Sequence, residues 1–237
     1  MAVDLSQRDL EWEGCYNVRD LGGLPTVQGG TTRFGALVRS DNPWRLTEEG
    51  LATMRAHGIR SVVDLRDHSE VTERPSVELD HVVNVSVLDF GDEEYWERWR
   101  GVFDTPRFYS EVLERWSDRF TAAVVAVARA PEGGVLVHCE VGRDRTGLVC
   151  ALLLSVAGVP SEAIAADYAL SAERLAPLYA EWLRVEQDPH NRSRLERENV
   201  SDAAAMARVL DNLDVERYLL DAGATARDLD AIRARLT

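Results

Sequence analysis

One stretch constrains the fold of this chain more than any other: Val135–Leu154, which reads VLVHCEVGRDRTGLVCALLL. An apolar, β-branched run is followed by a short charged segment and then by a second apolar run. The first run has the length and composition of a buried strand that ends at His138, and the second those of a buried helix that starts at Thr146. The charged segment between them is then the turn that joins a strand to a helix.

Such a turn can bind an anion. Gly142 gives the middle of the turn backbone freedom, and successive N–H groups beside a helix N-terminus form an anion-binding nest. Arg145 can close the ring with a planar, two-pronged contact to phosphate oxygens. Cys139 lies at the base of the ring in positive potential, which favours its thiolate, the nucleophile of phosphoryl transfer through a phosphocysteine. The predicted phosphate-binding residues are Glu140, Val141, Gly142, Arg143, Asp144 and Arg145.

Four neighbouring residues each have two interpretations. We expect His138 to orient the turn rather than act as a base. Thr146 is an N-cap by position, and its hydroxyl can also bond to the Cys139 sulfur. Arg143 and Asp144 are predicted to belong to the site, with a solvated surface pair as the alternative.

The segment HCEVGRDRTG resembles the signature loop of the protein tyrosine phosphatase superfamily. It is most similar to a bacterial tyrosine/dual-specificity and lipid phosphatase group whose loop reads His-Cys-x-x-Gly-Lys-Asp-Arg-Thr-Gly. The segments NVRDLGG (17–23), GALVRSD (35–41), VVDLR (62–66, with Glu70 and Pro75 downstream) and DYALSAE (167–173) also resemble this group, so the resemblance covers most of the chain.

The resemblance implies a cysteine-dependent phosphatase fold with a helical lid, no metal and no cofactor. It also implies Cys139 as the nucleophile and Arg145 as the phosphate clamp. The chain departs from the group at Arg143, which replaces a lysine, and at Glu140, where lipid-directed relatives often carry lysine. A carboxylate there favours phosphotyrosine or another simple monoester over phosphoinositides.

The resemblance leaves the general acid open. Asp144 is the first candidate, Asp89 the second and Asp104 the third, because some superfamily members place the acid on a separate loop. Three further charged residues, Asp20, Asp64 and Arg66, are expected to hold the loop and its arginine by ion pairs, with ordinary turn charges as the alternative.

Composition narrows the classes of function. The formal net charge of −14 argues against nucleic acid and anionic membranes as partners, and leaves a phosphorylated protein or a small phosphomonoester as the expected substrate. All 27 basic residues are arginine, and the three widely spaced cysteines fit a reducing cytoplasm. No apolar run is long enough to span a bilayer. Oligomeric state is not predicted.

Alternating strands and helices predict an α/β fold with a mostly parallel central sheet flanked by helices, in one domain over residues 1–237. A hairpin region is expected at about 15–40, with a turn at Gly29–Gly30. A long helix is expected over Pro106–Ala130. A lid insertion is expected at about 91–106, where Trp96, Trp99 and Phe103 form one apolar helical stripe; a helix packed permanently on the core is the alternative.

The predicted activity is hydrolysis of a phosphomonoester by a protein-tyrosine or dual-specificity phosphatase. A small-metabolite or phosphoinositide phosphatase is the alternative substrate class. A sulfur-transfer or arsenate-reducing protein also cradles an anion over a cysteine, but the chain has no obvious partner cysteine near the loop. A non-catalytic phosphate-binding pseudophosphatase would lack the nucleophile, the arginine or the acid, and Cys139, Arg145 and Asp144 are all present.

Overall fold

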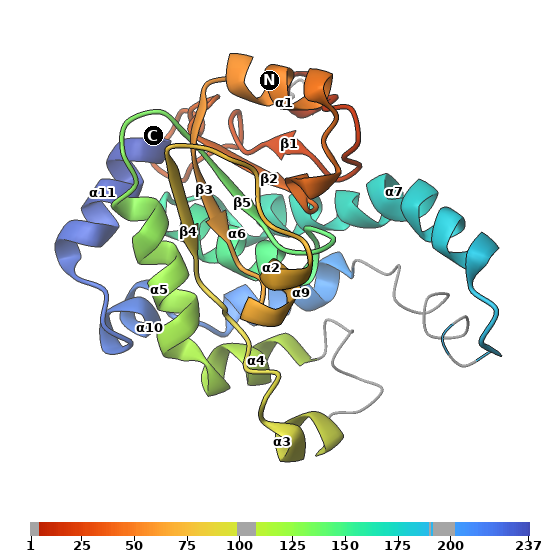
Figure 1. Ribbon diagram of the computed structural model, residues 1–237. Coiled ribbons are helices and arrows are strands. Elements are labelled where there is room, and N and C mark those ends of the chain that lie inside the picture. The colour runs from red at the N-terminus through yellow and green to blue at the C-terminus, as the bar shows by residue number, and fades with distance from the viewer. Residues whose placement is uncertain (1–4, 99–107, 190, 192–201) are drawn as a thin grey trace.

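The structure is a computed structural model that describes residues 5–98, 108–189, 191 and 202–237. Its centre is a five-stranded sheet in the order β1-β2-β5-β3-β4 (Figure 1). The strands are β1 (Arg19–Asp20), β2 (Leu37–Ser40), β3 (Ile59–Asp64), β4 (His81–Asn84) and β5 (Gly134–His138). β2, β5, β3 and β4 are parallel, and β1 pairs antiparallel with β2 at one edge. The predicted α/β class with a mostly parallel sheet is therefore confirmed.

Helices surround this sheet. They are α1 (Glu48–Ala56), α2 (His68–Glu73), α3 (Glu93–Arg98), α4 (Tyr109–Arg115), α5 (Ser117–Ala128), α6 (Asp144–Val156), α7 (Ser161–Val185), α9 (Ala203–Asp211), α10 (Val215–Asp221) and α11 (Ala226–Leu236). Short 3₁₀ turns span Leu5–Arg8 and Pro43–Arg45. As the sequence predicts, Thr47 caps α1 by accepting from the Gly50 N–H.

Both faces of the sheet are buried at the strands β2, β3 and β5, and alternate residues of these strands enter different cores. Val38, Val62 and Leu136 pack with Trp12 and Met54 under α1. Their strand neighbours join the larger core that α4, α5, α6 and α9–α11 share; they are Leu37, Val63, Val135 and Val137. The two apolar layers hold β5 in the centre of the sheet and so fix the point at which its carboxyl end emerges.

The long helix α7 leaves the body of the fold at its C-terminal end (Figure 1). Leu175, Leu178 and Tyr179 on this helix pack against Tyr16 and Val141. The helix therefore joins the N-terminal segment to the turn that follows β5.

Two expected elements differ from the structure. The single helix over Pro106–Ala130 is wrong for the described residues, since α4 and α5 are separated at Trp116, whose φ of −121° and ψ of 39° are not helical. This break directs the Trp116 ring against Trp96 (5.5 Å between centroids) and Tyr95 (4.7 Å). In the region 15–40, the extended pairing joins β1 to β2, and only one bridge, Pro25–Thr31, flanks the turn at Gly29–Gly30.

The insertion at 91–106 is described only as far as Arg98, so Trp99, Phe103 and Asp104 lie outside the described residues. Trp96 is half-buried in this insertion, with its ring 5.0 Å from that of Phe90. Its Nε1 donates to the Asp89 carbonyl at 2.6 Å. The described part of the insertion is thus packed on the core, while a lid function stays a prediction.

We expect Trp96→Ala to lower the free energy of unfolding by about 2–3 kcal/mol, somewhat below the cost of truncating a fully buried tryptophan. The variant loses ring stacking on Trp116 and the hydrogen bond to Asp89. Chemical denaturation monitored by circular dichroism measures the change. An unchanged unfolding midpoint would show that α3 does not contribute to the core.

Candidate active site

The charged turn of residues 139–143 lies where the central strand β5 ends and α6 begins. Its neighbours β2 and β3 run parallel to β5, so their carboxyl ends meet at the same edge of the sheet, which is where ligands bind in open α/β folds. The helix begins at Asp144, two residues earlier than expected, and Arg143 occupies the N-cap position. Thr146 is therefore not the cap. Its buried hydroxyl has no hydrogen-bond partner among the described residues, so the expected bond to the Cys139 sulfur is not seen.

Every carbonyl group of this turn is bonded to a donor outside it. His138 Nδ1 lies 3.0 Å from the Cys139 oxygen, the Asn42 N–H donates to Glu140 (3.0 Å), Asn17 Nδ2 to Val141 (3.0 Å), Arg39 Nη2 to Gly142 (2.8 Å), and the Gly147 N–H to Arg143 (2.8 Å). A peptide whose carbonyl points one way directs its N–H the opposite way. Carbonyls held outward therefore turn the N–H groups toward the inside of the ring.

Within the part of the chain that the structure describes, the N–H groups of residues 140–143 have no hydrogen-bond partner. Unbonded N–H groups at a helix N-terminus bind anions well. Gly142 makes the tight turn possible, since its φ of +67° is in the left-handed region and a Cβ there would collide with the Ser40 carbonyl.

Cys139, the first residue of this turn, is buried, with 2% of its surface exposed. His138 precedes it and is fully buried, and burial lowers its pKa, so its imidazole stays neutral near pH 7. Because His138 Nδ1 faces the Cys139 carbonyl and Nε2 lies 3.6 Å from Asp64, this residue contacts the frame of the loop.

Arg145 is held by Glu70 on α2. Nη1 and Nη2 of the arginine donate to the two carboxylate oxygens at 2.6 and 2.9 Å, and the Phe90 ring centroid lies 5.8 Å from the guanidinium carbon. Burial opposes the charge of Glu70, but the hydrogen bonds and charge of Arg145 outweigh it and lower the Glu70 pKa. A guanidinium has five N–H groups, so three remain for phosphate oxygens. Sequence reasoning gave Glu70 no role, although it lies in a segment quoted for the resemblance.

Arg143 and Asp144 form a pair rather than two solvated charges. Arg143 is buried, its Nη2 lies 3.0 Å from Asp144 Oδ2, and it stacks over the Tyr179 ring at 6.0 Å. The Tyr109 hydroxyl donates to Asp144 and also lies 2.7 Å from the Tyr168 hydroxyl. Asp144 is 27% exposed at its side chain, so solvent or a substrate can still reach it.

The carboxylate of Glu140 is paired with neighbouring side chains. Its carboxylate accepts from Arg74 and from Asn42 Nδ2 (3.0 Å), and lies 3.9 Å from Arg66 Nη1. Arg66 itself is bound by Asp64, with Nη2 2.7 Å from Oδ2. Asp64 and Arg66 therefore lie beside the loop, and the charge of Glu140 is balanced by Arg74, which is exposed, and by Arg66, which is buried.

Three other residues that the sequence assigned to the site have no contact with the loop among the described residues or lie outside those residues. Asp20 bonds to the N–H groups of Gly22 (2.7 Å) and Gly35 (2.8 Å) and to His57 (2.8 Å), and no contact joins it to the loop among the described residues. It organises the N-terminal segment instead. Asp89 is 44% exposed and pairs with Arg119 at 2.8 Å. Asp104, the third candidate acid, lies outside the described residues.

Sequence reasoning missed a buried carboxylate behind the loop. Asp167 on α7 forms ion pairs with Arg8, Arg19 (2.9 Å) and Arg39 (2.9 Å), all of them buried. Burial would raise the Asp167 pKa, but the three guanidinium groups outweigh that effect and lower it. The signal was present, because Arg19, Arg39 and Asp167 all lie in segments that resemble the phosphatase group.

Asp41 is a second buried carboxylate near the loop. It accepts from the N–H groups of Tyr16 (3.0 Å) and Asn17 (2.9 Å) and has no ion pair within 4 Å among the described residues. Burial raises its pKa to about 6. Asp41 therefore fixes the backbone of Asn17, whose side chain bonds to Val141.

The free energy of unfolding should depend on pH through Asp41. Because its folded pKa exceeds the unfolded value of about 3.9, the folded state holds the proton more tightly, and the contribution of Asp41 to stability falls as pH rises from about 4 to about 6. Relative to wild type, Asp41→Asn should gain about 2–3 kcal/mol across that window, at about 1.36 kcal/mol per pKa unit. Urea unfolding at several pH values measures the difference, and parallel curves would contradict the raised pKa.

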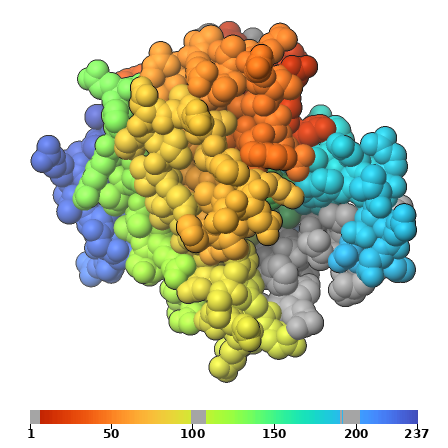
Figure 2. Space-filling model, in the orientation of Figure 1, coloured from red at the N-terminus to blue at the C-terminus, as the bar shows by residue number. Residues whose placement is uncertain are grey.

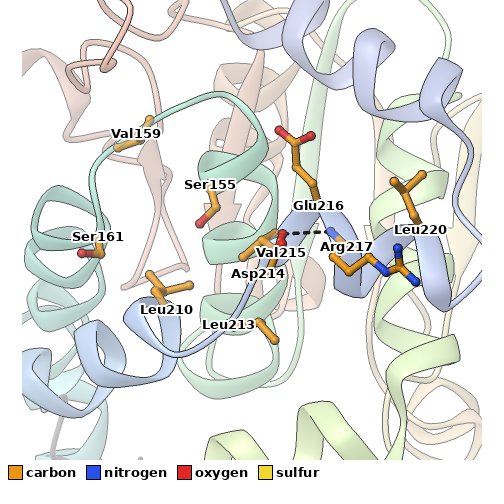
Figure 3. Close-up of a pocket in the computed structure, with 10 residues that line it drawn as sticks. All are labelled: Ser155, Val159, Ser161, Leu210, Leu213, Asp214, Val215, Glu216, Arg217 and Leu220. Atoms are coloured by element: carbon orange, nitrogen blue, oxygen red, sulfur yellow. Dashed lines mark hydrogen bonds between the residues drawn. The ribbon is translucent and has the colours of Figure 1, made fainter.

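A cleft of about 570 Å³ lies elsewhere, beside the C-terminal end of α6 (Figure 3). Its lining includes Ser155, Ser161, Leu210 and Asp214, and the Asp214 carboxylate already caps α10 at the Arg217 N–H. Because the turn of residues 139–143 is at the opposite end of α6, this cleft is separate from the candidate site.

Over residues 5–98, 108–189, 191 and 202–237, no helix is long and apolar enough to cross a membrane. In the same ranges, no group of three or more histidine, cysteine or acidic residues is placed to hold a metal ion. Figure 2 shows that the segment in orange, which includes α1 and α2, and the C-terminal part of α7, in cyan, reach the same face of the molecule.

Comparison with known proteins agrees with this geometry. The sequence model of the tyrosine phosphatase family matches residues 10–237. The chain is 30% identical over 201 residues to the triple specificity protein phosphatase PtpB of Mycobacterium tuberculosis, covering 72% of this chain and 71% of that protein. It is 30% identical over 145 residues to a tyrosine-protein phosphatase of Nostoc commune, covering 59% and 49%.

A protein of Cupriavidus necator, named provisionally as a tyrosine-protein phosphatase, is 33% identical over 180 residues, covering 72% of this chain and 65% of that protein. The chain thus spans about half to two thirds of the length of the last two relatives. The family match takes in the turn of residues 139–143, Arg145 and the segments that contact them, and the chain belongs to the tyrosine phosphatase family.

Proposed function

We propose that this protein hydrolyses phosphomonoesters through a phosphocysteine on Cys139, with phosphotyrosine as the preferred substrate and phosphoserine or phosphothreonine as further substrates. One observation carries the proposal: in the turn that begins with the buried Cys139, the carbonyls of residues 139–143 are all bonded outward. The N–H groups of residues 140–143 have no hydrogen-bond partner among the described residues. This arrangement offers several donors to the three non-bridging oxygens of one phosphoryl group.

The chemical steps follow from the positions of three side chains. The Cys139 thiolate attacks phosphorus, the bond from phosphorus to the leaving oxygen breaks, and that oxygen takes a proton from Asp144. Asp144 then takes a proton from water, whose oxygen attacks the phosphocysteine and releases phosphate and the thiolate. Arg145, aligned by Glu70, stabilises the charge on the phosphoryl oxygens in both steps.

Asp144 remains the first candidate for the acid because it lies next to Arg145 and is partly exposed. The Tyr109 hydroxyl and Arg143 hold its carboxylate in place. Asp89 is tied to Arg119, but its neighbour Phe90 reaches Arg145, so a separate acid loop is the alternative.

An aromatic surface supports an aryl phosphate as the substrate. Phe90 is 43% exposed beside Arg145, so the phenyl ring of phosphotyrosine can stack there while its phosphate enters the ring of N–H groups. The partnered charge of Glu140 adds little repulsion of its own, so the preference for phosphotyrosine over phosphoinositides depends on this aromatic contact. Sulfur transfer, arsenate reduction and non-catalytic phosphate binding are the alternatives.

Cys139→Ser should abolish hydrolysis of p-nitrophenyl phosphate while phosphate still binds, because an alkoxide is not available near neutral pH and the N–H groups are unchanged. Steady-state kinetics and phosphate calorimetry measure the two effects. Cys15→Ser is the matched control. Burial raises the pKa of Cys15, and its thiol donates to the Asn42 carbonyl, so Cys15 is not expected to act as a nucleophile and activity should persist. Substantial turnover by Cys139→Ser would rule out the covalent mechanism.

Asp144→Asn should slow substrates with poor leaving groups, such as phenyl phosphate, by about 10²–10⁴-fold, the usual range for general acid catalysis. A nitrophenyl ester should lose far less, because its leaving oxygen needs no proton. Rates for a series of aryl phosphates of graded leaving-group acidity measure the effect, with Asp89→Asn compared in parallel. A leaving-group-dependent loss in Asp89→Asn, with a uniform loss in Asp144→Asn, would assign the acid to Asp89.

A further inference from the structure

We infer that Asp167 and the side chains it organises, Arg19, Arg39 and Asn17, are positioning residues that hold the phosphate-binding turn open for its substrate. The inference rests on the proposed function, since it explains how that turn keeps its shape. None of these side chains is proposed to touch the reacting atoms. They act through the backbone of residues 141–143.

The first arm of this frame is Arg39 on β2. Its Nη1 donates to Asp167 Oδ2 at 2.9 Å, and its Nη2 donates to the carbonyls of Gly142 (2.8 Å) and Arg143 (3.3 Å). A planar guanidinium holds both ends of this contact in fixed geometry. Arg39 therefore links Asp167 to the backbone at the middle of the turn.

The second arm is longer and runs in parallel. Arg19 Nε donates to Asp167 Oδ1 at 2.9 Å, and its Nη1 donates to Asn17 Oδ1 at 2.6 Å. This bond assigns the oxygen side of the Asn17 amide, so the nitrogen side faces the Val141 carbonyl at 3.0 Å. One carboxylate on α7 thereby orients three consecutive carbonyls of the turn.

Stability alone is a poor explanation for this cluster. Three buried arginines share one aspartate, and burying such an excess of charge costs more than a well-packed apolar group. Burial and the nearby Arg39 lower the pKa of Arg19 to about 9, which reflects that cost. Perturbed ionisable groups of this kind gather at functional sites. Here Arg39 contacts the carbonyls of the phosphate-binding turn directly, and Arg19 is linked to the turn through Asn17.

Two variants test the frame. Arg39→Lys keeps the buried charge but cannot bond Asp167 and two carbonyls together. Asn17→Leu keeps the branched shape of the side chain and removes the amide, leaving Asp167 and its arginines in place, so it carries the test if Arg39→Lys does not fold. Asp228→Asn is the matched control. Asp228, on α11, makes a two-pronged pair with Arg129 (2.7 and 3.0 Å), and this pair is remote from the turn.

The readouts are phosphate affinity by calorimetry, kcat and KM for p-nitrophenyl phosphate, and thermal unfolding. Both frame variants should bind phosphate at least tenfold more weakly and lose about a hundredfold in kcat/KM, the cost of a misplaced catalytic group, at temperatures where they remain folded. Asp228→Asn should unfold at a lower temperature with unchanged kinetics and phosphate affinity.

The outcomes separate the frame from the proposed function. Folded variants that bind phosphate as wild type does would overturn the frame, even if their stability falls. Wild type that binds phosphate without turnover would overturn the proposed hydrolysis while the affinities still test the frame. Wild type that binds no phosphate would overturn both.

Discussion

The outward hydrogen bonds of the carbonyls of residues 139–143 are the interaction on which the rest of this structure depends. A ring of inward N–H groups costs free energy unless the opposite side of each peptide is satisfied. The bonding partners come from the end of β5, β2, the segment after it, the N-terminal segment and α6, so distant parts of the chain must fold before the ring exists. The parallel sheet supplies the fixed platform, because two buried layers hold β5 between β2 and β3.

Charge is distributed around the ring in an ordered way. The arginines nearest the loop each have a carboxylate partner: Arg143 with Asp144, Arg145 with Glu70, Arg66 with Asp64, and Arg74 with Glu140. Among the described residues, the buried cluster behind the loop differs, since Asp167 is shared by three arginines. The excess of positive charge near the loop therefore comes from this cluster, in a chain whose net charge is −14.

The sequence predicted the parts of the site that are local in the chain. Cys139, Gly142 and Arg145 lie within one turn between two apolar runs, so their spacing and flanking periodicity indicate an anion-binding loop. Glu70, Asn17 and Asp167 act through contacts with partners tens of residues away, and no local pattern encodes such a contact. Trp116 shows the same limit, because the break in the helix at this residue accompanies stacking on Trp96, a contact with a separate helix that helix propensity does not encode. Asp20 was expected to pair with the loop, but it bonds to Gly22, Gly35 and His57 instead. A sequence motif shows which residues occur together, but not which residue each of them contacts.

A crystal structure with orthovanadate tests the central claim most directly, since vanadate mimics the phosphoryl group in transfer. The account predicts vanadium bonded to Cys139 Sγ, with its oxygens accepting from the N–H groups of residues 140–143 and from Arg145, while the carbonyls keep their bonds to Asn17, Arg39 and Asn42. Vanadate bound away from Cys139, or a carbonyl of residues 139–143 turned into the ring, would contradict it.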